Sequence, residues 1–496
     1  MQFPILSLIV FAPLVIAVLM LLYKPERKTE VRVTALAAAI FELVLSGWVY
    51  LQVYLNSATP GYQFQEKYSW LPALGISYHV GVDGLSAPLV LLTGIVMFTG
   101  VLISWGIDDR PREFFAFLFL LAGGVFGVFV SLDLFMLFFF YEIAVFPMYL
   151  LIAIWGWKVT REYAAMKLTL YLFIGSVLAL LGGLAMYFTN YQMHGTLTFD
   201  MLDLEKAGFS QAFQYLWFLP TFMGFAVLGG IFPFHNWSPD GHVAAPTAVS
   251  MFHAGVLMKL GAFAALRVGI MLLPEGAKQW VWLIFGLAMV NVVYGAFIAM
   301  IQTDLKYVIG FSSVSHMGLV SLGFATLTRE GMTGAGLQMF SHGVMTALFF
   351  AAVGMVYDRA HTRQIPELGG MVKPLPFVAI AFIIGGLVSM GMPGFSGFIA
   401  EFPIFMGVWQ THWFAAVIAS ISIVITAAYI LLAIRRSFFG DLPPQFEGHI
   451  GAISVLDKVA LGTLSLIMIT LGLFPNLMVP MVSSGVQNVL RLLGGA

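Results

Sequence analysis

The feature that most constrains this chain is a succession of apolar segments that recurs along its whole length. A helix of roughly 20 apolar residues spans a hydrocarbon core about 30 Å thick, and windows of that size locate about fourteen such segments. They begin near Pro4, Val33, Gly84, Phe114, Leu134, Lys167, Phe213, Ala244, Gln279, Leu305, Ala335, Pro376, Trp413 and Leu456. Only 9% of the residues are charged and the mean hydropathy is +0.94, which leaves no room for a sizeable water-soluble domain. The sequence therefore predicts an all-α polytopic membrane protein.

Basic residues gather in alternate connections between these segments. Of the 23 Lys and Arg residues, the odd-numbered loops hold Lys24, Arg27, Lys28, Arg32, Arg110, Arg112, Lys158, Arg161, Lys167, Lys306, Arg359, Arg363, Lys373, Arg435, Arg436 and Lys458. By the positive-inside rule these loops are cytoplasmic. We therefore expect a multi-pass protein of a bacterial inner membrane with both termini on the periplasmic side. A short interfacial helix is expected on that side over Phe199 to Gln214, which carries several charges.

The composition excludes several classes of function. The chain has no cysteine, which excludes disulfides, iron–sulfur ligation, thiolate zinc sites and cysteine nucleophiles. The 23 basic and 24 acidic residues nearly cancel, so no basic surface for nucleic acid is expected. No nucleotide-binding loop or zinc spacing is present. Buried histidines could in principle hold a haem, but we expect the chain to carry neither a cofactor nor a metal.

Three charged residues lie near the middle of strongly apolar segments: Glu142, Lys259 and Glu401. A charge at mid-membrane costs about 2.5–3.5 kcal/mol even on insertion scales, so each one needs a reason. A structural ion pair between helices is one reading. A role in transport is the reading we favour, because three such groups are costly to keep as clamps alone.

Histidines and hydroxyls extend this set. His253, His316 and His342 all fall within segments, and imidazole exchanges protons near neutral pH. Two polar stripes recur at helical spacing, one of Gln338, His342 and Thr346 and one of Ser312, Ser315 and His316. Such stripes indicate either a hydrated path through the membrane or polar contacts that join helices.

Two segments are interrupted by helix breakers at mid-depth. One interruption runs from Gly229 to Pro239 and the other from Gly391 to Gly397. Such breaks are tolerated only inside protein or against a water-filled cavity. They lie five segments apart, which predicts two inverted five-helix repeats, each with a broken helix, as in secondary transporters. We expect a three-helix segment at 1–111, the repeats at 112–270 and 279–437, and a C-terminal helix and tail at 438–496.

Four stretches carry a resemblance to a known family. They are Phe232 through Lys259 with its Pro-Phe-His-Asn-Trp-Ser-Pro-Asp-Gly-His core, Phe140-Tyr-Glu142 followed by Pro147-Met-Tyr, Lys306 with Ser312 to Gly318, and Gly391-Met-Pro-Gly with Glu401-Phe. Over most of its length the chain resembles the antiporter-like subunits of respiratory complex I, within the Mrp antiporter-related superfamily. It looks most like subunit M, or chain 4, because only about twenty residues follow the last segment. The distal L-type subunit instead has a long lateral helix and an extra span after this core.

This resemblance implies a fold of fourteen helices with two inverted repeats. It implies a non-redox subunit of a proton-translocating NADH-quinone oxidoreductase, with L-like and N-like neighbours in the bilayer and quinone bound elsewhere. It also implies roles for particular residues. The proton-translocating set would be Glu142, Lys259, His316, His342 and Glu401, supported by His235, His253, Gln338, Thr346 and Ser312.

One position departs from the family. The lysine that usually lies in the first broken helix, and pairs with the glutamate at 142, is replaced here by Leu228. We therefore expect Lys259 to take its place in a direct or water-bridged pair with Glu142. The alternatives are a histidine partner, either His253 or His235, or a carboxylic acid that stays protonated without a partner.

Two other functions share these features. One is a subunit of a multi-chain cation/proton antiporter, with protons or sodium as the transported ion. The other is a membrane anchor or scaffold in a hydrogenase-like complex, with its path partly disabled. Co-purifying chains with iron–sulfur clusters and flavin would distinguish the complex I-type protein from the antiporter.

Overall fold

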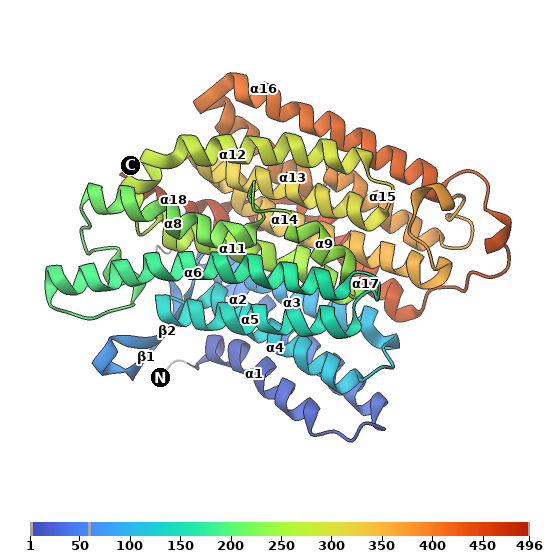
Figure 1. Cartoon of the computed structure of the whole chain (residues 1–496), viewed down its shortest axis with the longest axis horizontal. Helices are drawn as coiled ribbons and strands as arrows, with labels where there is room; N and C mark the ends of the chain where they lie inside the picture. The colour runs from blue at the N-terminus through green and yellow to red at the C-terminus, as the bar shows by residue number, and fades with distance from the viewer. Residues whose placement is uncertain (1–2, 58–60, 495–496) are drawn as a thin grey trace.

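A computed structural model describes residues 3–57 and 61–494 of the chain, so the extreme ends lie outside the described residues. The helices run side by side across a single bundle (Figure 1). Within the described residues, 12 helices are long and apolar enough to cross a membrane, and Ile5–Leu21 and Pro376–Ser389 are shorter apolar ones. The prediction of an all-α polytopic membrane protein is confirmed.

The elements follow the predicted segments closely. The helices of the first half are α1 (Ile5–Leu21), α2 (Lys28–Leu55), α3 (Ser86–Ile103), α4 (Pro111–Val130), α5 (Leu134–Trp155), α6 (Arg161–His194), α7 (Met201–Leu204), α8 (Gln211–Gly229) and α9 (Trp237–Ala244). One continuous span then comprises α10 (Thr247–Phe252), η3 (His253–Leu257), α11 (Met258–Ala264) and η4 (Ala265–Ile270). The second half has α12 (Pro274–Ile301), α13 (Leu305–Ala325), α14 (Arg329–Ala360), α15 (Pro376–Ser389), α16 (Ser396–Phe438), α17 (Val455–Leu473) and α18 (Val479–Leu492).

Helix α16 contains two predicted segments. His412 has non-helical backbone angles in its interior, so the chain turns there and returns across the bundle. The part of α16 before His412 completes the broken span that α15 begins. The part after it is a separate span, beginning at Trp413 as the sequence indicated.

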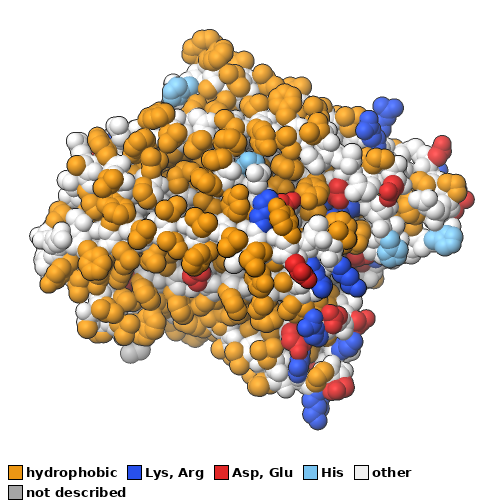
Figure 2. Space-filling view, in the orientation of Figure 1, with side chains coloured by type: hydrophobic (Ala, Val, Ile, Leu, Met, Phe, Trp, Pro, Cys, Tyr) orange, Lys and Arg blue, Asp and Glu red, His pale blue; other side chains and the backbone are white. Residues whose placement is uncertain are grey.

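The bundle has two unlike ends. In Figure 1 both chain ends and the strands β1 and β2 lie at one end, which we call the hairpin end. The opposite end, which we call the basic end, holds the odd-numbered loops near residues 22–27, 104–110, 156–160, 302–304, 361–375 and 439–454. In Figure 2 charged side chains gather at that end, and hydrophobic side chains cover the rest of the face shown. Apolar surface between polar ends is what a bilayer requires.

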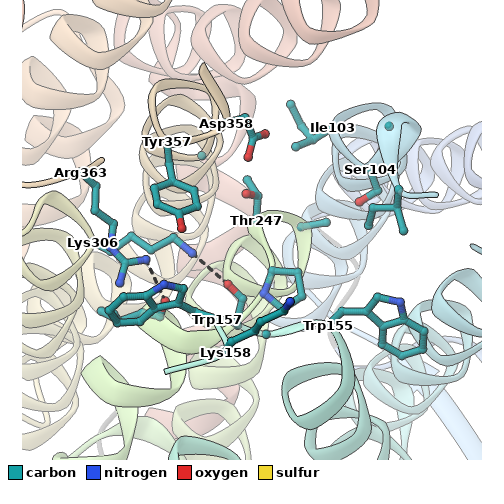
Figure 3. Close-up of a pocket in the computed structure, with 18 residues that line it drawn as sticks. Ile103, Ser104, Trp155, Trp157, Lys158, Thr247, Lys306, Tyr357, Asp358 and Arg363 are labelled. Carbon is teal, nitrogen blue, oxygen red and sulfur yellow. Dashed lines mark hydrogen bonds between the residues drawn. The ribbon is translucent and has the colours of Figure 1, made fainter. Parts of the chain in front are cut away.

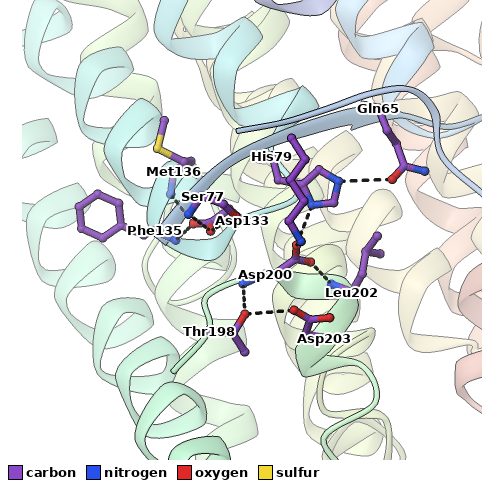
Figure 4. A network of polar contacts seen from close by, with 11 residues as sticks. Gln65, Ser77, His79, Asp133, Phe135, Met136, Thr198, Asp200, Leu202 and Asp203 are labelled. Carbon is purple, nitrogen blue, oxygen red and sulfur yellow. Dashed lines mark hydrogen bonds and ion pairs between the residues drawn. The ribbon is translucent and has the colours of Figure 1, made fainter. Parts of the chain in front are cut away.

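A β-hairpin at the hairpin end was not predicted. Strands β1 (Gln63–Leu71) and β2 (Ile76–Val82) pair antiparallel, with Lys67 opposite His79. Asp200 holds the hairpin to the bundle, because its Oδ2 lies 2.5 Å from Lys67 Nζ and 2.8 Å from His79 Nδ1 (Figure 4). Burial opposes ionisation of Asp200, but the hydrogen bonds from His79 and Lys67 hold the pKa of its carboxyl at about 2.

Asp133 fastens the same hairpin to the start of α5. Its carboxylate caps the helix by accepting hydrogen bonds from the amides of Phe135 and Met136. It also accepts a hydrogen bond of 3.0 Å from the Ser77 amide of β2 (Figure 4). A capping role for Asp133 therefore joins two elements that lie far apart in the sequence.

The interfacial helix expected over Phe199 to Gln214 is wrong. Within that range the short helix covers only the four residues of α7, and the helix that begins at Gln211 is the membrane-spanning α8. Asp200 caps α7 while binding the hairpin, and Gly208 adopts a left-handed backbone (φ +70°) that ends any helix. A second unpredicted element is α18, which covers the hairpin end through contacts such as Arg329 Nε to Ser483 Oγ at 3.1 Å.

Both breaks lie where the sequence placed them. The first follows α8, where Gly230 adopts φ +76°. Asn291 of α12 occupies this break: its Oδ1 accepts the Phe232 amide at 2.6 Å and its Nδ2 donates to the Gly230 carbonyl at 2.8 Å. The second break lies between α15 and α16, with Gly391 at φ +62° and Gly394 at φ +93°. At the first break, backbone groups that a continuous helix would satisfy are thus satisfied by the Asn291 side chain, and at the second break the amides of Gly391 and Met392 donate to nearby carbonyls.

Candidate functional site: a buried chain of ionisable groups

Lys259 lies at one end of a buried polar chain. The span that carries it changes from α-helix to a π-helical turn over η3, immediately before α11. Wider turns of this kind leave backbone carbonyls without their usual partners. Lys259 uses one of them, since its Nζ donates to the carbonyl of Ala254. The same Nζ lies 2.7 Å from Nδ1 of His342 on α14, and both side chains are fully buried.

His342 connects Lys259 to His316. A charged lysine can only donate, so Nδ1 of His342 accepts and the ring carries its proton on Nε2. That Nε2 has no hydrogen-bond partner among the described residues. The ring of His316 on α13 lies 5.3 Å from the ring of His342, measured between centroids. The free Nε2–H is therefore available for transfer toward a neighbour while Nδ1 faces the lysine.

His316 lies in direct contact with the carboxylate at the other end of the chain. Its Nδ1 is 3.0 Å from Oε1 of Glu401 at the start of α16, and its Nε2 is 3.0 Å from the hydroxyl of Ser389 at the end of α15. Gln338 of α14 donates to the same Glu401 oxygen at 3.1 Å. Nδ1 of His316 is therefore placed to donate to the carboxylate, while the direction of the hydrogen bond between Nε2 and the serine hydroxyl depends on the protonation of the ring.

The second break positions Glu401. Gly391 lies against the carboxylate, and a Cβ at that position would come within 2.9 Å of Oε2. The left-handed backbone of Gly391 and this close approach together require glycine. The break therefore brings the glutamate of one helix to a histidine of another in the middle of the bundle.

The five predicted residues are not all brought together. Lys259, His342, His316 and Glu401 form one chain through α11, α14, α13 and α16, with Gln338 beside it. Glu142 is not part of it. Its side chain is exposed on the surface of α5 and no ion pair or hydrogen bond joins it to any described residue.

The expected direct pair between Glu142 and Lys259 is therefore wrong. Phe139 and Phe146, which share the face of Glu142 at helical spacing, are 42% and 60% exposed, so that face of α5 points out of the bundle. Lys259 points the other way, toward α14. No direct histidine contact replaces the pair, since His235 and His253 make no hydrogen bond within the described chain.

The supporting residues take varied positions. Thr346 donates only to the carbonyls of His342 and Gly343 on its own helix. Ser312 accepts a hydrogen bond from Tyr429 at 2.8 Å. His253 stacks on Trp237 at 5.1 Å, and its ring meets His242 at 4.3 Å.

A cavity of about 760 Å³ opens at the basic end (Figure 3). Lys306 lies buried in its wall, and its Nζ donates to the Ala245 carbonyl at 2.9 Å and lies 3.3 Å from Ser250 Oγ. Arg363 stacks over Trp157 at 4.5 Å and pairs with Asp304 at 2.6 Å. The cavity thus provides a space large enough for water next to a buried lysine.

Sequence reasoning did not select two residues of this region. Lys306 belongs to a recognisable motif, but it begins α13 and reads as a loop residue. His242 follows the first break, is fully buried, and accepts or donates one hydrogen bond to Ser238 at 2.9 Å. The signal that could have identified His242 is its place as the second histidine of the Pro-Phe-His-Asn-Trp-Ser-Pro-Asp-Gly-His stretch.

Within the described residues, histidines, aspartates and glutamates form no cluster of three or more able to hold a metal ion. The arrangement instead suits proton exchange along neighbouring acids and bases in a desolvated core.

Comparison with known proteins places this site in a family. The model of the NADH:quinone oxidoreductase/Mrp antiporter transmembrane family matches residues 131–426, which include both breaks and the whole buried chain. The chain belongs to this family.

Individual relatives agree over nearly the whole length. The NADH-quinone oxidoreductase subunit M of Rickettsia conorii is 34% identical over 494 residues, covering 99% of each chain. The NAD(P)H-quinone oxidoreductase chain 4 2 of Microcystis aeruginosa is 38% identical over 89% of this chain and 80% of its own. A chain of respiratory complex I from Thermus thermophilus with bound NADH superimposes with a TM-score of 0.89 at 27% identity, covering 99% of this chain and 100% of that one.

Proposed function

We propose that this chain is a membrane-arm subunit of a complex I-type NADH- or other donor:quinone oxidoreductase and moves protons without redox chemistry of its own. The observation that carries the proposal is the buried chain from Lys259 through His342 and His316 to Glu401. Its relatives of similar length are subunits of such oxidoreductases. The partners would be L-like and N-like membrane subunits, with quinone bound elsewhere in the complex.

Each step of transfer follows from the hydrogen bonds. A proton on Lys259 passes to Nδ1 of His342, while the proton on Nε2 of the same ring leaves toward His316. His316 in turn gives its Nδ1 proton to Glu401 and recovers one at a ring nitrogen. Every group accepts one proton for each that it releases, so net charge moves along the bundle without any bond to carbon changing.

The proton source for Lys259 lies at the basic end. Water in the cavity of about 760 Å³ would reach Lys306, whose Nζ lies 3.3 Å from Ser250 Oγ, and that hydroxyl donates to the backbone carbonyl of His242 at 2.8 Å. Lys306, His242 and Lys259 would therefore form the entry branch. This branch does not use Glu142 or a lysine at 228, which is consistent with the exposure of Glu142.

The two repeats would then have separate tasks. The unit at 112–270 contributes the first break and Lys259, and the unit at 279–437 contributes His316, His342 and Glu401. We also propose that these two units are inverted relative to each other in the membrane. The segment 1–111 precedes them, and the C-terminal segment 438–496 follows them.

In a bacterial inner membrane the basic end would face the cytoplasm and the hairpin end the periplasm. Because the chain has no cysteine, single cysteines report on this directly. Glu447→Cys at the basic end should react with an impermeant maleimide only in inside-out vesicles, and Lys206→Cys at the hairpin end only in right-side-out vesicles. The reverse pattern would overturn the orientation.

The main test is purification of the assembled complex from its native membrane. We expect chains with flavin and iron–sulfur clusters to co-purify. We also expect quinone reduction to acidify the compartment that the hairpin end faces in proteoliposomes. A multi-chain cation/proton antiporter is the second candidate, because the matching family model covers both classes. Co-purification with transporter chains only, and sodium-driven proton movement without electron donor, would favour it.

A further inference from the structure

A second cavity approaches the other end of the buried chain. It has a volume of about 310 Å³ and lies between α12, α13 and the returning part of α16, at the basic end. Gln302, Thr303 and Arg436 form its polar rim. Its walls are apolar, with Val308 and Ala433 buried on them, and Tyr429 is at its inner end. This cavity is separate from the one that holds Lys306.

Its depth follows from the helices that line it. Helix α13 begins at Leu305 at the basic end, and each residue adds about 1.5 Å along the axis. Val308 therefore lies roughly 5 Å inside the helix end, Ser312 about 10 Å and His316 about 16 Å. Tyr429 lies between the cavity and the level of His316, because its hydroxyl reaches Ser312.

Tyr429 meets the hydroxyl groups that border the buried chain. Its hydroxyl donates to Ser312 Oγ at 2.8 Å, and Ser312 lies one helical turn before His316 on α13. Ser389 Oγ is 3.0 Å from Nε2 of His316, whose Nδ1 contacts Glu401. The side chain of Tyr429, which is only 3% exposed, thus separates the cavity from the histidine–glutamate pair.

We propose that Tyr429 gates a second route for protons, from the basic end directly to His316 and Glu401. The inference rests on the proposed function and adds an access point that bypasses Lys259. In each passage the tyrosine hydroxyl gives its proton to the adjoining serine and receives one from water in the cavity. Ser312, which accepts from Tyr429, gives its own proton to Ser389, and Ser389 gives its own to Nε2 of His316, so all three hydroxyls return to their starting state.

The alternative occupant of the cavity is a lipid tail, since Met300 and Leu432 on its lining are 38% and 39% exposed. The polar rim and the hydroxyl at the inner end favour water. A tail would leave the Tyr429 hydroxyl with no exchange partner on the cavity side, whereas water supplies one.

Cysteine accessibility in the assembled complex distinguishes water from lipid. Ala433→Cys places a thiol on the cavity wall, and Leu431→Cys, two residues away and 54% exposed, places one at nearly the same depth on the outer surface. In inside-out vesicles we expect a charged methanethiosulfonate reagent to modify the first and not the second. Modification of both thiols only by a lipid-soluble reagent would overturn the water route.

A substitution then tests the tyrosine itself. Tyr429→Phe removes the hydroxyl but keeps the aromatic ring at the inner end of the cavity. Tyr149→Phe on α5 serves as the control. We expect assembly and the KM for quinone to be unchanged, while coupled proton translocation falls by about twofold, because the Lys259 route stays intact, and its solvent deuterium isotope effect rises. Unchanged translocation in Tyr429→Phe would overturn the gate.

The same assays separate this inference from the proposed function. If Glu401→Gln abolishes translocation and Tyr429→Phe leaves it unchanged, the buried chain conducts protons and only the second route is refuted. If neither variant affects translocation, the proposed function itself fails, and the gate fails with it.

Discussion

Nζ of Lys259 and Nδ1 of His342 lie 2.7 Å apart in the fully buried centre of the bundle, joining α11 to α14. This contact crosses between the two halves of the chain. Among the described residues, Lys259 is the only buried lysine in the middle of a span. Its side-chain partner is a neutral base instead of a carboxylate. A base that accepts at one nitrogen and releases at the other converts this contact into a path.

The first prediction concerns His342. His342→Phe keeps an aromatic ring in the same buried space but removes both nitrogens, so Lys259 loses its acceptor. We expect coupled quinone reduction to fall by about 10²-fold or more. The matched control is His253→Phe, because that ring stacks on Trp237 and makes no hydrogen bond with described residues. Equal losses in the two variants would argue for a packing defect instead of a lost relay.

The second prediction concerns the position that departs from the family. Leu228 is fully buried on α8, whereas Glu142 lies on the exposed face of α5 and Lys259 contacts His342. We expect Leu228→Lys to leave the activity of Lys259→Ala unrestored in the double variant, measured as donor-dependent proton uptake in membranes with normal subunit content. Rescue by the lysine at 228 would mean that Lys259 does replace the family's pair.

The third prediction concerns Asn291, which fills the first break. Asn291→Ala leaves the Phe232 amide and the Gly230 carbonyl without the partners they have now. Each buried unsatisfied group costs about 1–3 kcal/mol, so we expect a clearly lower thermal stability of the complex. Asn56→Ala, on the exposed end of α2, is the control and should melt like the unmodified complex. A thermal-shift assay in detergent compares them.

The fourth prediction concerns the hairpin and pH. Because its folded pKa is held at about 2, below the unfolded value of about 3.9, Asp200 contributes stability above roughly pH 4 that is lost only as pH falls toward 2. Its hydrogen bond to Asp200 raises the pKa of Lys67, so that contribution is lost only at strongly alkaline pH. Hairpin hydrogen exchange, corrected for intrinsic rates, should therefore show no protection change from pH 5 to 9.

Asp200→Asn should increase hairpin exchange severalfold at every pH in that range, because the ion pair with Lys67 is removed. Asp203→Asn is the control, since Asp203 accepts only from Thr198 in the same loop. A protection midpoint near neutral pH in the unmodified protein would show that the contact of Asp200 with His79, and not its ion pair with Lys67, controls the hairpin.

The sequence predicted the spans and the breaks well, because apolar length and Gly-Pro interruptions are local signals. It also indicated Lys259, His316, His342 and Glu401 as one functional group, since polar residues in apolar helices stand out. The spacing could not reveal that His342, instead of Glu142, faces Lys259. That depends on how α5 and α14 are rotated about their axes, and rotation is set by packing between helices distant in the sequence.

The remaining misses have similar causes. The hairpin is held by Asp200, more than a hundred residues away in the chain, and its short strands give a weak periodic signal. Tyr429 reads as an ordinary aromatic residue in an apolar segment, and only its contact with Ser312 distinguishes it. Lys306 lies at a helix start, where a basic residue normally signals a loop.

The central claim is that protons cross the bundle through Lys259, His342, His316 and Glu401. The most direct measurement is the number of protons translocated per pair of electrons in proteoliposomes that contain the assembled complex with Lys259→Ala. We expect translocation and quinone reduction to fall together, because a blocked path stalls the reaction that drives it, while Lys278→Ala at the surface changes neither. A Lys259→Ala complex that assembles normally and keeps the same proton-to-electron ratio and rate would contradict it.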